Sequence, residues 1–401
     1  MIEIKMYPAK NGDCFLLSFG TSKKNHILID CGYVETYEKF LKKDLLEIAK
    51  KKEKINLMIV THIDADHISG AIKLIKDNNS EKFIDIDEVW FNAYRHLQTQ
   101  KKAGTELNKK EIEILEREIA LGKSYIKRIN QNKIVTDEIS AKQGSTLGAL
   151  LLKGNYNWNN SFDNNAVSSN FDKCIRIGNT SIKILSPDQQ KLNKLENKWV
   201  KELKKKKWNF KINENELFDD AYEFMLLLGE NGSIVEHNEI SRMNKEEVLE
   251  VEEYIEKEYE MDSGDINGSS IAILIEYDEK KLLFLADAHP DIILKKIIEM
   301  GEIKFDVVKI SHHGSIKNTN SELAKLLNSK RYLFSSNGHK YGHPDPGTII
   351  KLLFANPQSE KYLYFNYETK TSKLFESKDL QKKYNYKAIT GKEKEPIVIE
   401  L

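Results

Sequence analysis

The chain has 401 residues, of which 40% are hydrophobic and 31% charged; this is enough for one large domain or two ordinary ones and excludes a disordered protein. The 62 basic and 62 acidic side chains cancel, so the chain lacks the overall positive field of a non-specific nucleic-acid binder, and any polyanion site must be local. The three cysteines have neither the number nor the spacing of a disulfide framework or a zinc knuckle, which indicates a reducing compartment.

The amino-terminal part of the chain is predicted to alternate between strands and a helix. Apolar runs bounded by turn residues predict strands at 2–7, 14–19 and 26–30. Between 33 and 54, apolar residues recur at helical spacing with lysines between them, which predicts an amphipathic helix with a solvated face. The apolar run 55–60 then predicts a buried strand that ends at Thr61. Polar residues after such a strand occupy the place where α/β proteins position their chemistry.

The middle of the chain is polar and mainly helical in pattern, with the clearest helix at 106–129. An Asn/Ser-rich loop at 155–170 carries Trp158 and Phe162, which we interpret as local packing anchors rather than as side chains that stack on a base. Strand character returns at 174–185. The segment 189–262 is dominated by charge, with a basic cluster at 201–207 and an acidic stretch at 246–260. We interpret it as a charged helical insertion between two β-rich halves of a single domain spanning 1–401.

The second half resumes the alternation of strands and helices. Strands are predicted at 271–277, 282–285, 305–310 and 331–334, and a helix is predicted after Pro290. No segment approaches the ~18 consecutive apolar residues of a transmembrane helix, and the amino terminus has no apolar core of a signal peptide. We therefore expect a cytoplasmic protein without membrane insertion.

The strongest chemical signal is a short motif directly after the strand at 55–60. It contains two imidazoles and two carboxylates, from His62, Asp64, Asp66 and His67. These side chains converge only if the chain turns tightly, and they are ligands that divalent zinc, manganese and iron accept. The motif therefore predicts a metal site, and the alternative is a polar surface loop.

Two more strand ends carry the same kinds of residue. Asp287 follows the strand at 282–285, and His312 and His313 follow the strand at 305–310. A single histidine at one of these places is more often structural, but the same pattern at three strand ends favours a shared site.

A fourth cluster follows the strand at 331–334 and includes Asn337, Tyr341 and His343. Such side chains can hydrogen-bond an oxyanion or protonate a leaving group. A glycine-rich turn with a capping residue is an equally good interpretation of this stretch.

Together these motifs resemble the metallo-β-lactamase-fold metallohydrolases. The resemblance rests on the motif at 62–67, on Gly12-Asp13 and the run 28–32 before it, and on Asp287 and the Ser-His-His-Gly-Ser run 311–315 after it. Within this family the chain is most similar to the branch that contains the nuclease-like domain of the bacterial competence DNA-uptake channel protein. That branch shares the His-x-Asp-x-Asp-His form and the Tyr-Gly-His-Pro run. The motifs extend in order from Gly12 to Pro344, whereas 95–261 matches only loosely.

The resemblance implies an α/β fold, an αββα sandwich of the metallo-β-lactamase type with a site for two divalent metal ions, zinc or manganese. It assigns His62 and Asp64 to the first ion, Asp66 and His67 to the second, and Asp287 to both. His312, or alternatively His313, completes the second site. In this family a hydroxide between the metals attacks a carbonyl or phosphoryl centre. We expect further catalytic roles for Asp66, His313 and His343. We expect substrate binding by Ser315, Asn337 and Tyr341.

Two departures from the family pattern concern the first metal site. The more familiar pattern has histidine at the place of Asp64, and it supplies another histidine before the strand that leads to Asp287. Without these imidazoles the site is rich in oxygen, which shifts its preference from zinc towards manganese or magnesium. Asp265 or Asn267 is a candidate to complete it.

The resemblance predicts a metal-dependent hydrolase, and three observations favour a phosphodiesterase or nuclease. These are the nearest branch of the family, the oxygen-rich site, and the position of Lys309 and the strand-end histidines where a phosphate can be held. The substrate is then a nucleic acid, with the lysines at 201–207 as a phosphate track, or a small phosphodiester. The alternatives are an esterase and a metal-stabilised component of a bacterial defence system that binds a protein partner through the charged insertion.

Overall fold

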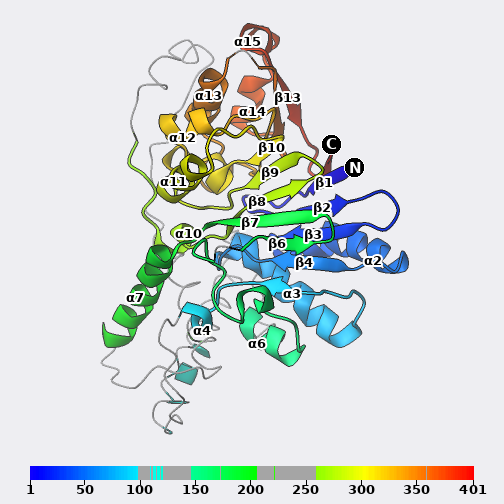
Figure 1. The fold of residues 1–401 in the computed structure, drawn as a ribbon, viewed down its shortest axis with the longest axis vertical. Helices are drawn as coiled ribbons and strands as arrows, with labels where there is room; N and C mark the ends of the chain where they lie inside the picture. Colours follow the sequence, from blue (N-terminus) through cyan, green and yellow to red (C-terminus); the bar gives the residue numbers. More distant parts are fainter. Residues whose placement is uncertain are drawn as a thin grey trace.

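The computed structural model describes residues 1–97, 146–171, 173–205, 259–357 and 359–401, together with scattered positions between 109 and 120 and residue 221. Within these residues the chain forms an α/β fold in which two sheets are stacked and helices cover their outer faces (Figure 1). This is the αββα sandwich that the sequence predicts. The two chain ends lie side by side because the last strand pairs with the first.

The first sheet has the strand order β14-β1-β2-β3-β4-β5 among the described residues. Its strands are β1 (Ile2–Met6), β2 (Phe15–Phe19), β3 (Asn25–Ile29), β4 (Ile55–Ile59), β5 (Val89–Trp90) and β14 (Ile397–Glu400). The pairs from β14 to β3 are antiparallel, whereas β3, β4 and β5 run parallel. The carboxyl ends of β3 and β4 therefore meet at one edge of this sheet.

The second sheet has the order β13-β12-β11-β10-β9-β8-β7-β6 among the described residues. Its strands are β6 (Ile175–Ile177), β7 (Thr180–Ser186), β8 (Ala272–Tyr277), β9 (Lys280–Phe284), β10 (Val307–Lys309), β11 (Arg331–Phe334), β12 (Lys361–Phe365) and β13 (Tyr386–Thr390). Strands β6 to β9 pair antiparallel and β9 to β13 pair parallel. The ends of β9, β10 and β11 therefore also share one edge.

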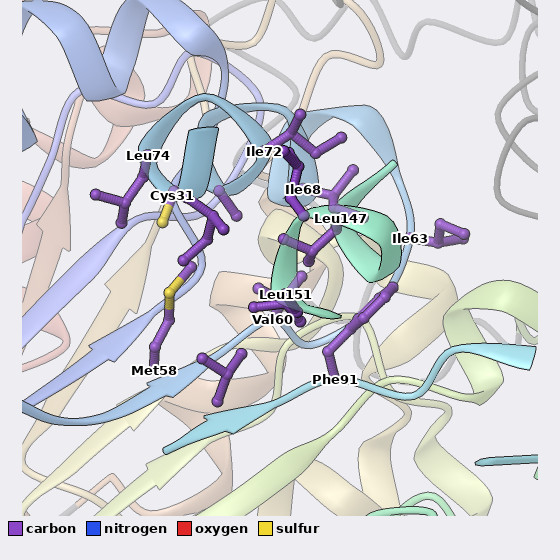
Figure 2. Close-up of a cluster of buried hydrophobic side chains, with 14 of the residues drawn as sticks. Cys31, Met58, Val60, Ile63, Ile68, Ile72, Leu74, Phe91, Leu147 and Leu151 are labelled. Carbon is purple, nitrogen blue, oxygen red and sulfur yellow. The ribbon is translucent and has the colours of Figure 1, made fainter. Parts of the chain in front are cut away.

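Helices pack on the outer face of the first sheet around a core that includes Met58, Val60, Ile68 and Leu151 (Figure 2). The helical run predicted from the spacing of Tyr37, Leu41, Leu45 and Ile48 is present with all four side chains buried, although it ends at Lys50. Its segments, and other helices on this side, are α1 (Val34–Thr36), η1 (Tyr37–Leu41), α2 (Lys42–Lys50), α3 (Ala65–Glu81), α4 (Tyr94–Leu97) and α6 (Leu147–Lys153). The short helix η2 (Asn160–Phe162) instead places Phe162 in the core between the sheets.

The inter-sheet core and the second outer core follow from the alternation of side chains along each strand. In β9, Leu282 and Phe284 point between the sheets, whereas Leu283 points to the outer helices. The remaining helices are α7 (Gln189–Lys205), α10 (Asp265–Gly268), α11 (Pro290–Met300), η4 (Ser311–Gly314), η5 (Ile316–Asn318), α12 (Ser321–Leu326), α13 (Pro346–Ala355), α14 (Lys370–Phe375) and α15 (Lys378–Lys383).

The charged segment 189–262 connects β7 and β8, which are antiparallel neighbours in one sheet. Its first part forms α7, while 206–220 and 222–258 lie outside the described residues, as does most of the helix predicted at 106–129. Trp158 and Phe162 are buried: the Trp158 Nε1 donates to the Phe91 carbonyl at 2.8 Å, and Phe162 packs edge-on against Trp90. Their interpretation as packing anchors is confirmed.

All three cysteines are free thiols, with Cys14 and Cys31 buried and Cys174 exposed. Among the described residues, none of the helices combines the length and the apolar character needed to span a bilayer.

Candidate metal centre

The candidate site lies where strands of both sheets end. His62 follows β4, Asp287 follows β9, and His312 and His313 follow β10. Ala286, His312 and His313 have φ angles of 46°, 48° and 57°. Non-glycine residues rarely adopt this left-handed conformation, and where several do so together the surrounding structure must enforce it, as is common at functional sites.

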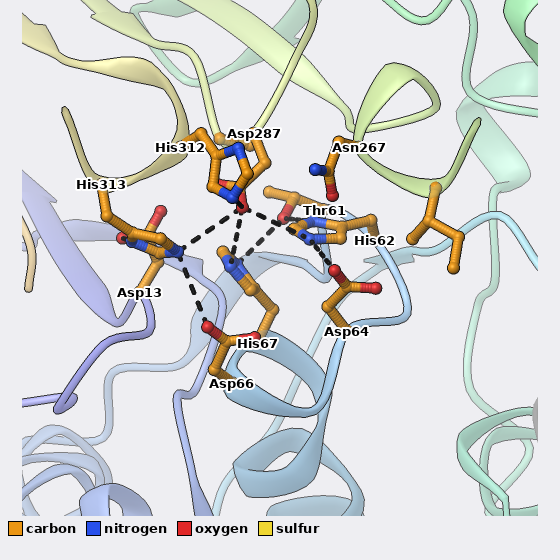
Figure 3. Close-up of polar contacts among 12 residues, drawn as sticks. Asp13, Thr61, His62, Asp64, Asp66, His67, Asn267, Asp287, His312 and His313 are labelled. Carbon is orange, nitrogen blue, oxygen red and sulfur yellow. Dashed lines mark hydrogen bonds and ion pairs between the residues drawn. The ribbon is translucent and has the colours of Figure 1, made fainter. Parts of the chain in front are cut away.

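The centre of the site is one carboxylate oxygen, Oδ2 of Asp287. Four imidazole Nε2 atoms surround it, those of His313 at 3.5 Å, His67 at 3.7 Å, and His62 and His312 at 3.8 Å (Figure 3). These distances are too long for hydrogen bonds. We refer to these five residues with Asp64 and Asp66 as the His/Asp cluster.

The other nitrogen of each imidazole, Nδ1, is bonded to an acceptor in the protein. His67 donates to Asp30 Oδ2 at 2.8 Å, and His313 donates to the Ser335 carbonyl at 2.9 Å. His62 donates to the Thr61 hydroxyl oxygen at 3.0 Å, since that hydroxyl gives its own proton to Asp30. His312 Nδ1 lies 3.2 Å from Asp262 Oδ2 and 3.0 Å from Asn318 Oδ1. All four rings therefore turn Nε2 towards Asp287 while Nδ1 is held by the protein, which is the arrangement of metal-binding histidines.

The first turn of α3 supplies the remaining members of the cluster. Asp64 is the N-cap residue of this helix, and its Oδ2 lies 3.6 Å from His62 Nε2. Asp66 Oδ2 lies 3.6 Å from His313 Nε2 and accepts a hydrogen bond of 2.8 Å from Asn11. A helix N-terminus stabilises negative charge, so acidic side chains are favourable at these positions. The motif at 62–67 thus folds as the sequence predicts, with a tight turn between strand and helix.

A buried ion pair lies behind the cluster. Lys309 Nζ contacts the Asp13 carboxylate, donates to the Ala286 carbonyl at 3.0 Å and lies 3.8 Å from Asp287 Oδ1. Asp13 Oδ1 in turn lies 3.4 Å from His313 Nδ1. A lysine buried in this way neutralises part of the negative charge of the site and holds the chain around Asp287 and His313 in place.

The charges of the cluster influence one another strongly. Burial by itself lowers the pKa of His67, but the carboxylates of Asp287, Asp30 and Asp66 outweigh it and raise that pKa well above its usual value. Burial also opposes protonation of His313, yet Asp287 and Asp13 raise its pKa to about 9. For Asp287 burial raises the pKa, and the neighbouring imidazoles bring it well below its usual value. The cluster therefore attracts positive charge.

The residues fit divalent metal ions. The Nε2 atoms of His62 and His67 and Oδ1 of Asp287 are buried without a hydrogen-bond partner, which is costly unless a cation binds there. Two ligands at about 2.1 Å from one tetrahedral ion lie about 3.4 Å apart, close to the shortest contacts of the cluster. Among the described residues, Asp13, His67, Asp287 and His313 have ligand atoms that all lie within 4.8 Å of one another.

The predicted catalytic residue His343 and the predicted substrate-binding residues differ in their surroundings. The His343 ring lies 5.7 Å from the ring of His312, and Tyr341 lies beside His343 with 55% of its surface exposed. Ser315 is buried, and its hydroxyl accepts from Lys317 N in the local turn. Asn337 likewise accepts from His339 N. The Asn337 contact agrees with the turn interpretation of the fourth cluster.

Several residues of the site were given no role by sequence reasoning. Asp13 and Asp30 lie in runs that carry the family resemblance, so their position in a motif was the available signal. For Asn11 and Asp262 the sequence offered no signal of a role in the site. Of the two candidates for the first metal site, Asn267 lies on the side of His62 and Asp64 (Figure 3), whereas Asp265 lines a cavity behind the cluster.

Residues 7–123 match a family model described as "Metallo-beta-lactamase superfamily". The matched region includes Asp13, Asp30 and the motif at 62–67 but ends before Asp287, and it does not distinguish the competence branch. No curated protein matches the chain.

Among solved structures, a mutant of the CmlA β-hydroxylase is similar to this chain at 11% sequence identity and a TM-score of 0.36. The similarity covers 100% of this chain and 54% of the other, so the chain spans about half the length of that protein. The superfamily match at 7–123 and the two stacked sheets are consistent with the metallo-β-lactamase fold, and the His/Asp cluster supplies side chains that can hold divalent metal ions.

Proposed function

We propose that this protein hydrolyses phosphodiesters with two divalent ions, zinc or manganese, held by the His/Asp cluster. The observation that carries the proposal is the convergence of four imidazole Nε2 atoms on one oxygen of Asp287, with every Nδ1 bonded elsewhere. A structural histidine uses both ring nitrogens in hydrogen bonds, whereas these rings reserve one nitrogen each for a common point.

Two groups of ligands can be separated around Asp287. Figure 3 shows His313 and Asp66 on one side of Asp287 and His62 and Asp64 on the other. We assign Asp66, His67 and His313 to the second ion, because His313 Nε2 lies 3.6 Å from Asp66 Oδ2. His312 then joins His62 and Asp64 at the first ion, and Asp287 serves both.

The first group retains the oxygen-rich character that the sequence indicates. Asp64 takes the place of a histidine, and Asn267 lies nearby with its amide nitrogen donating to Asp262 at 2.8 Å. We propose that its carbonyl oxygen contributes to this group. Carboxylate and amide oxygens favour manganese or magnesium over zinc, so we expect this ion to exchange more readily than the other.

The paired ions supply a Lewis acid for a phosphoryl oxygen and lower the pKa of water. The protein's part is to orient the reaction. His343 Nδ1 lies 3.2 Å from Asp345 Oδ2, and Asp345 also accepts a 2.8 Å hydrogen bond from Ile316 N. The Asp345 carboxylate holds the His343 ring beside His312. We propose that the His343 imidazole donates a proton to the leaving oxygen there.

A polyanionic substrate agrees with the rim of the site. Tyr341 is exposed next to His343, and Lys340 Nζ lies 4.8 Å from the centre of its ring. An exposed tyrosine with an adjacent ammonium can stack on a base while it contacts a phosphate. Tyr341 and Lys340 therefore support a nucleic acid or a nucleotide as the substrate.

The three free thiols support our proposal of a cytoplasmic location.

The segment 189–262 remains our proposed insertion, and its end reaches the site. Asp262, its last residue, contacts His312 Nδ1 and accepts a 3.1 Å hydrogen bond from Asn318. We therefore propose that a protein partner bound to this insertion would act on the metal centre.

The proposal is tested by incubating the purified protein with Mn²⁺ or Zn²⁺ and single-stranded DNA, double-stranded DNA, RNA or bis(p-nitrophenyl) phosphate. Asp66→Ala removes a proposed ligand, and Glu81→Ala removes a carboxylate at the other end of the same helix as a control. We expect metal-dependent cleavage by the wild type and by Glu81→Ala, and none by Asp66→Ala. Cleavage of the small diester alone would identify a small phosphodiester as the substrate. Metal binding without hydrolysis of any diester would overturn the proposal and favour an ester or a partner-binding role.

A further inference from the structure

A cavity of about 350 Å³ lies directly behind the metal centre, between α7, α10 and the start of α11. This volume falls in the range of about 300–1,000 Å³ that is typical of small-molecule sites. Figure 1 shows these three helices along one flank of the molecule. Asp262 connects the cavity to the cluster, because its Oδ2 lies 3.2 Å from His312 Nδ1 and its Oδ1 lies 3.7 Å from His289 Nε2.

His289 lines this cavity and has a ring hydrogen-bond donor without a partner. Its Nδ1 lies 3.0 Å from Lys191 Nζ, and an ammonium group can only donate, so Nδ1 is the acceptor and the ring proton is on Nε2. That Nε2 is buried without a hydrogen-bond partner, in a side chain whose residue is only 7% exposed. Gly268 packs against the ring, where a Cβ atom would lie 2.7 Å from Cε1. The ring is therefore held in one place with its donor unsatisfied.

The charges around the cavity argue against an anionic occupant. Lys191 Nζ is already bonded to both oxygens of Asp291, at 2.8 and 2.9 Å. Asp262 and Asp265 also line the cavity, so with Asp291 three carboxylates face the two lysines Lys191 and Lys194, and the lining as a whole disfavours a phosphate. A neutral group that both accepts and donates hydrogen bonds suits this lining better.

Met261, Pro290 and Leu294 give the cavity aliphatic walls, and Ser263 and Asn320 add polar groups beside them. A flat ring with apolar faces and a polar edge matches them, since its faces would pack on these side chains. Its edge could accept from His289 Nε2 and donate to the Asp265 carboxylate.

We propose that this cavity binds a nucleobase of the substrate, next to the phosphodiester at the metal centre. The inference rests on the proposed function, because it takes the substrate to be a nucleic acid or a nucleotide. It adds that recognition uses the base, through a pocket separate from the exposed Tyr341.

The test compares the binding of nucleoside monophosphates with that of ribose 5-phosphate, which lacks the base. Calorimetric titrations use the full chain with Mn²⁺ and AMP, GMP, CMP or UMP. We expect at least one nucleotide to bind about tenfold more tightly than ribose 5-phosphate. Equal affinity for all five compounds would overturn the inference, even if bis(p-nitrophenyl) phosphate is hydrolysed. Base-dependent binding without hydrolysis of any diester would support the cavity and overturn the proposed function.

Two variants of α11 locate the base. Leu294→Trp fills the cavity, whereas Ile298→Trp adds the same side chain one turn further along, at a position that is 57% exposed. We expect the preference for the nucleotide to disappear in Leu294→Trp and to persist in Ile298→Trp. A preference retained in Leu294→Trp, or lost in both variants, would place the base elsewhere and overturn the inference. His289→Phe, which keeps the ring and removes the donor, tests the same preference if Leu294→Trp does not fold.

Discussion

His26 is buried, as are His62, His67 and His313 of the His/Asp cluster, and His312 is half-buried, yet their ring nitrogens have different partners. In His26 both nitrogens are used: Nδ1 lies 2.9 Å from Ser18 Oγ and Nε2 lies 3.1 Å from Glu53 Oε2. In the cluster each Nδ1 has an acceptor, and each Nε2 faces Asp287 at a distance too long for a hydrogen bond. The comparison shows that burial alone does not identify a histidine that can bind a metal. What distinguishes the cluster is that the Nε2 atoms lack hydrogen bonds and face the same carboxylate oxygen.

The two regions are connected by strand β3. His26 lies near its amino end, and Asp30 follows its carboxyl end and accepts from His67 Nδ1. One strand therefore carries a closed hydrogen-bonded group at one end and a supporting carboxylate of the metal centre at the other. Substitutions at the two ends should have different effects on activity, metal binding and stability.

The largest expected effect follows from Asp287→Asn, which removes the charge on the shared oxygen. We expect kcat/KM for bis(p-nitrophenyl) phosphate to fall on the order of a thousandfold, because both proposed ions lose a ligand. His26→Gln serves as the matched control at the other end of β3 and should remain within about twofold of the wild type. Similar losses in the two variants would remove the distinction between the regions.

Metal removal should destabilise the wild-type protein. An ion present at 100 times its Kd stabilises the folded state by about 2.7 kcal/mol, because it binds the folded state alone. We expect a chelator to lower the Tm of the wild type and added Mn²⁺ to restore it, while Asp287→Asn responds to neither. An unchanged wild-type Tm, measured by calorimetry, would argue against bound ions.

A smaller effect is expected from Asp30→Asn, which weakens the acceptor of the His67 Nδ1 proton. Partners of this kind typically change metal affinity about 10- to 100-fold. Titration of the metal-free variant with Mn²⁺ should show this loss. A Kd equal to that of the wild type would mean that the orientation of His67 does not depend on Asp30.

The smallest effect concerns the pH dependence of stability at His26. Burial lowers the pKa of His26 below its usual value of 6.5, and Glu53 only partly opposes this. Below pH 6.5 the unfolded chain therefore holds more protons than the folded one, so stability is full above that pH and falls as the pH decreases. The slope contributed by this residue is at most about 1.4 kcal/mol per pH unit. Denaturant unfolding between pH 7 and 5.5 should show a shallower decline in His26→Gln, and equal declines would count against this account.

The strands, the αββα architecture and the convergence of the strand ends could be predicted from the sequence. Apolar runs fix where β4, β9 and β10 lie. Parallel pairing brings the carboxyl ends of β9 and β10 to one edge of the second sheet and those of β3 and β4 to one edge of the first. The stacking of the two sheets, which the family resemblance implies, then brings Asp287 together with the motif at 62–67.

The roles of the supporting residues could not be predicted from periodicity, because these residues reach the site from turns; for Asp13 the family motif was the available signal. Asp13 arrives from the turn between β1 and β2, and Asp262 arrives from the end of the charged segment. The orientation of His312 and His313 was equally hidden. Alternation along a strand would point them apart, but both adopt a left-handed conformation, with φ of 48° and 57°, and both imidazoles face Asp287.

The most direct test of the central claim is the metal content of the protein, measured by mass spectrometry after dialysis against excess Mn²⁺ or Zn²⁺ and removal of free ions. The account predicts two ions per chain in the wild type and in His26→Gln, and fewer than one in Asp287→Asn. A wild-type chain without bound metal, or equal metal content in Asp287→Asn and the wild type, would contradict it.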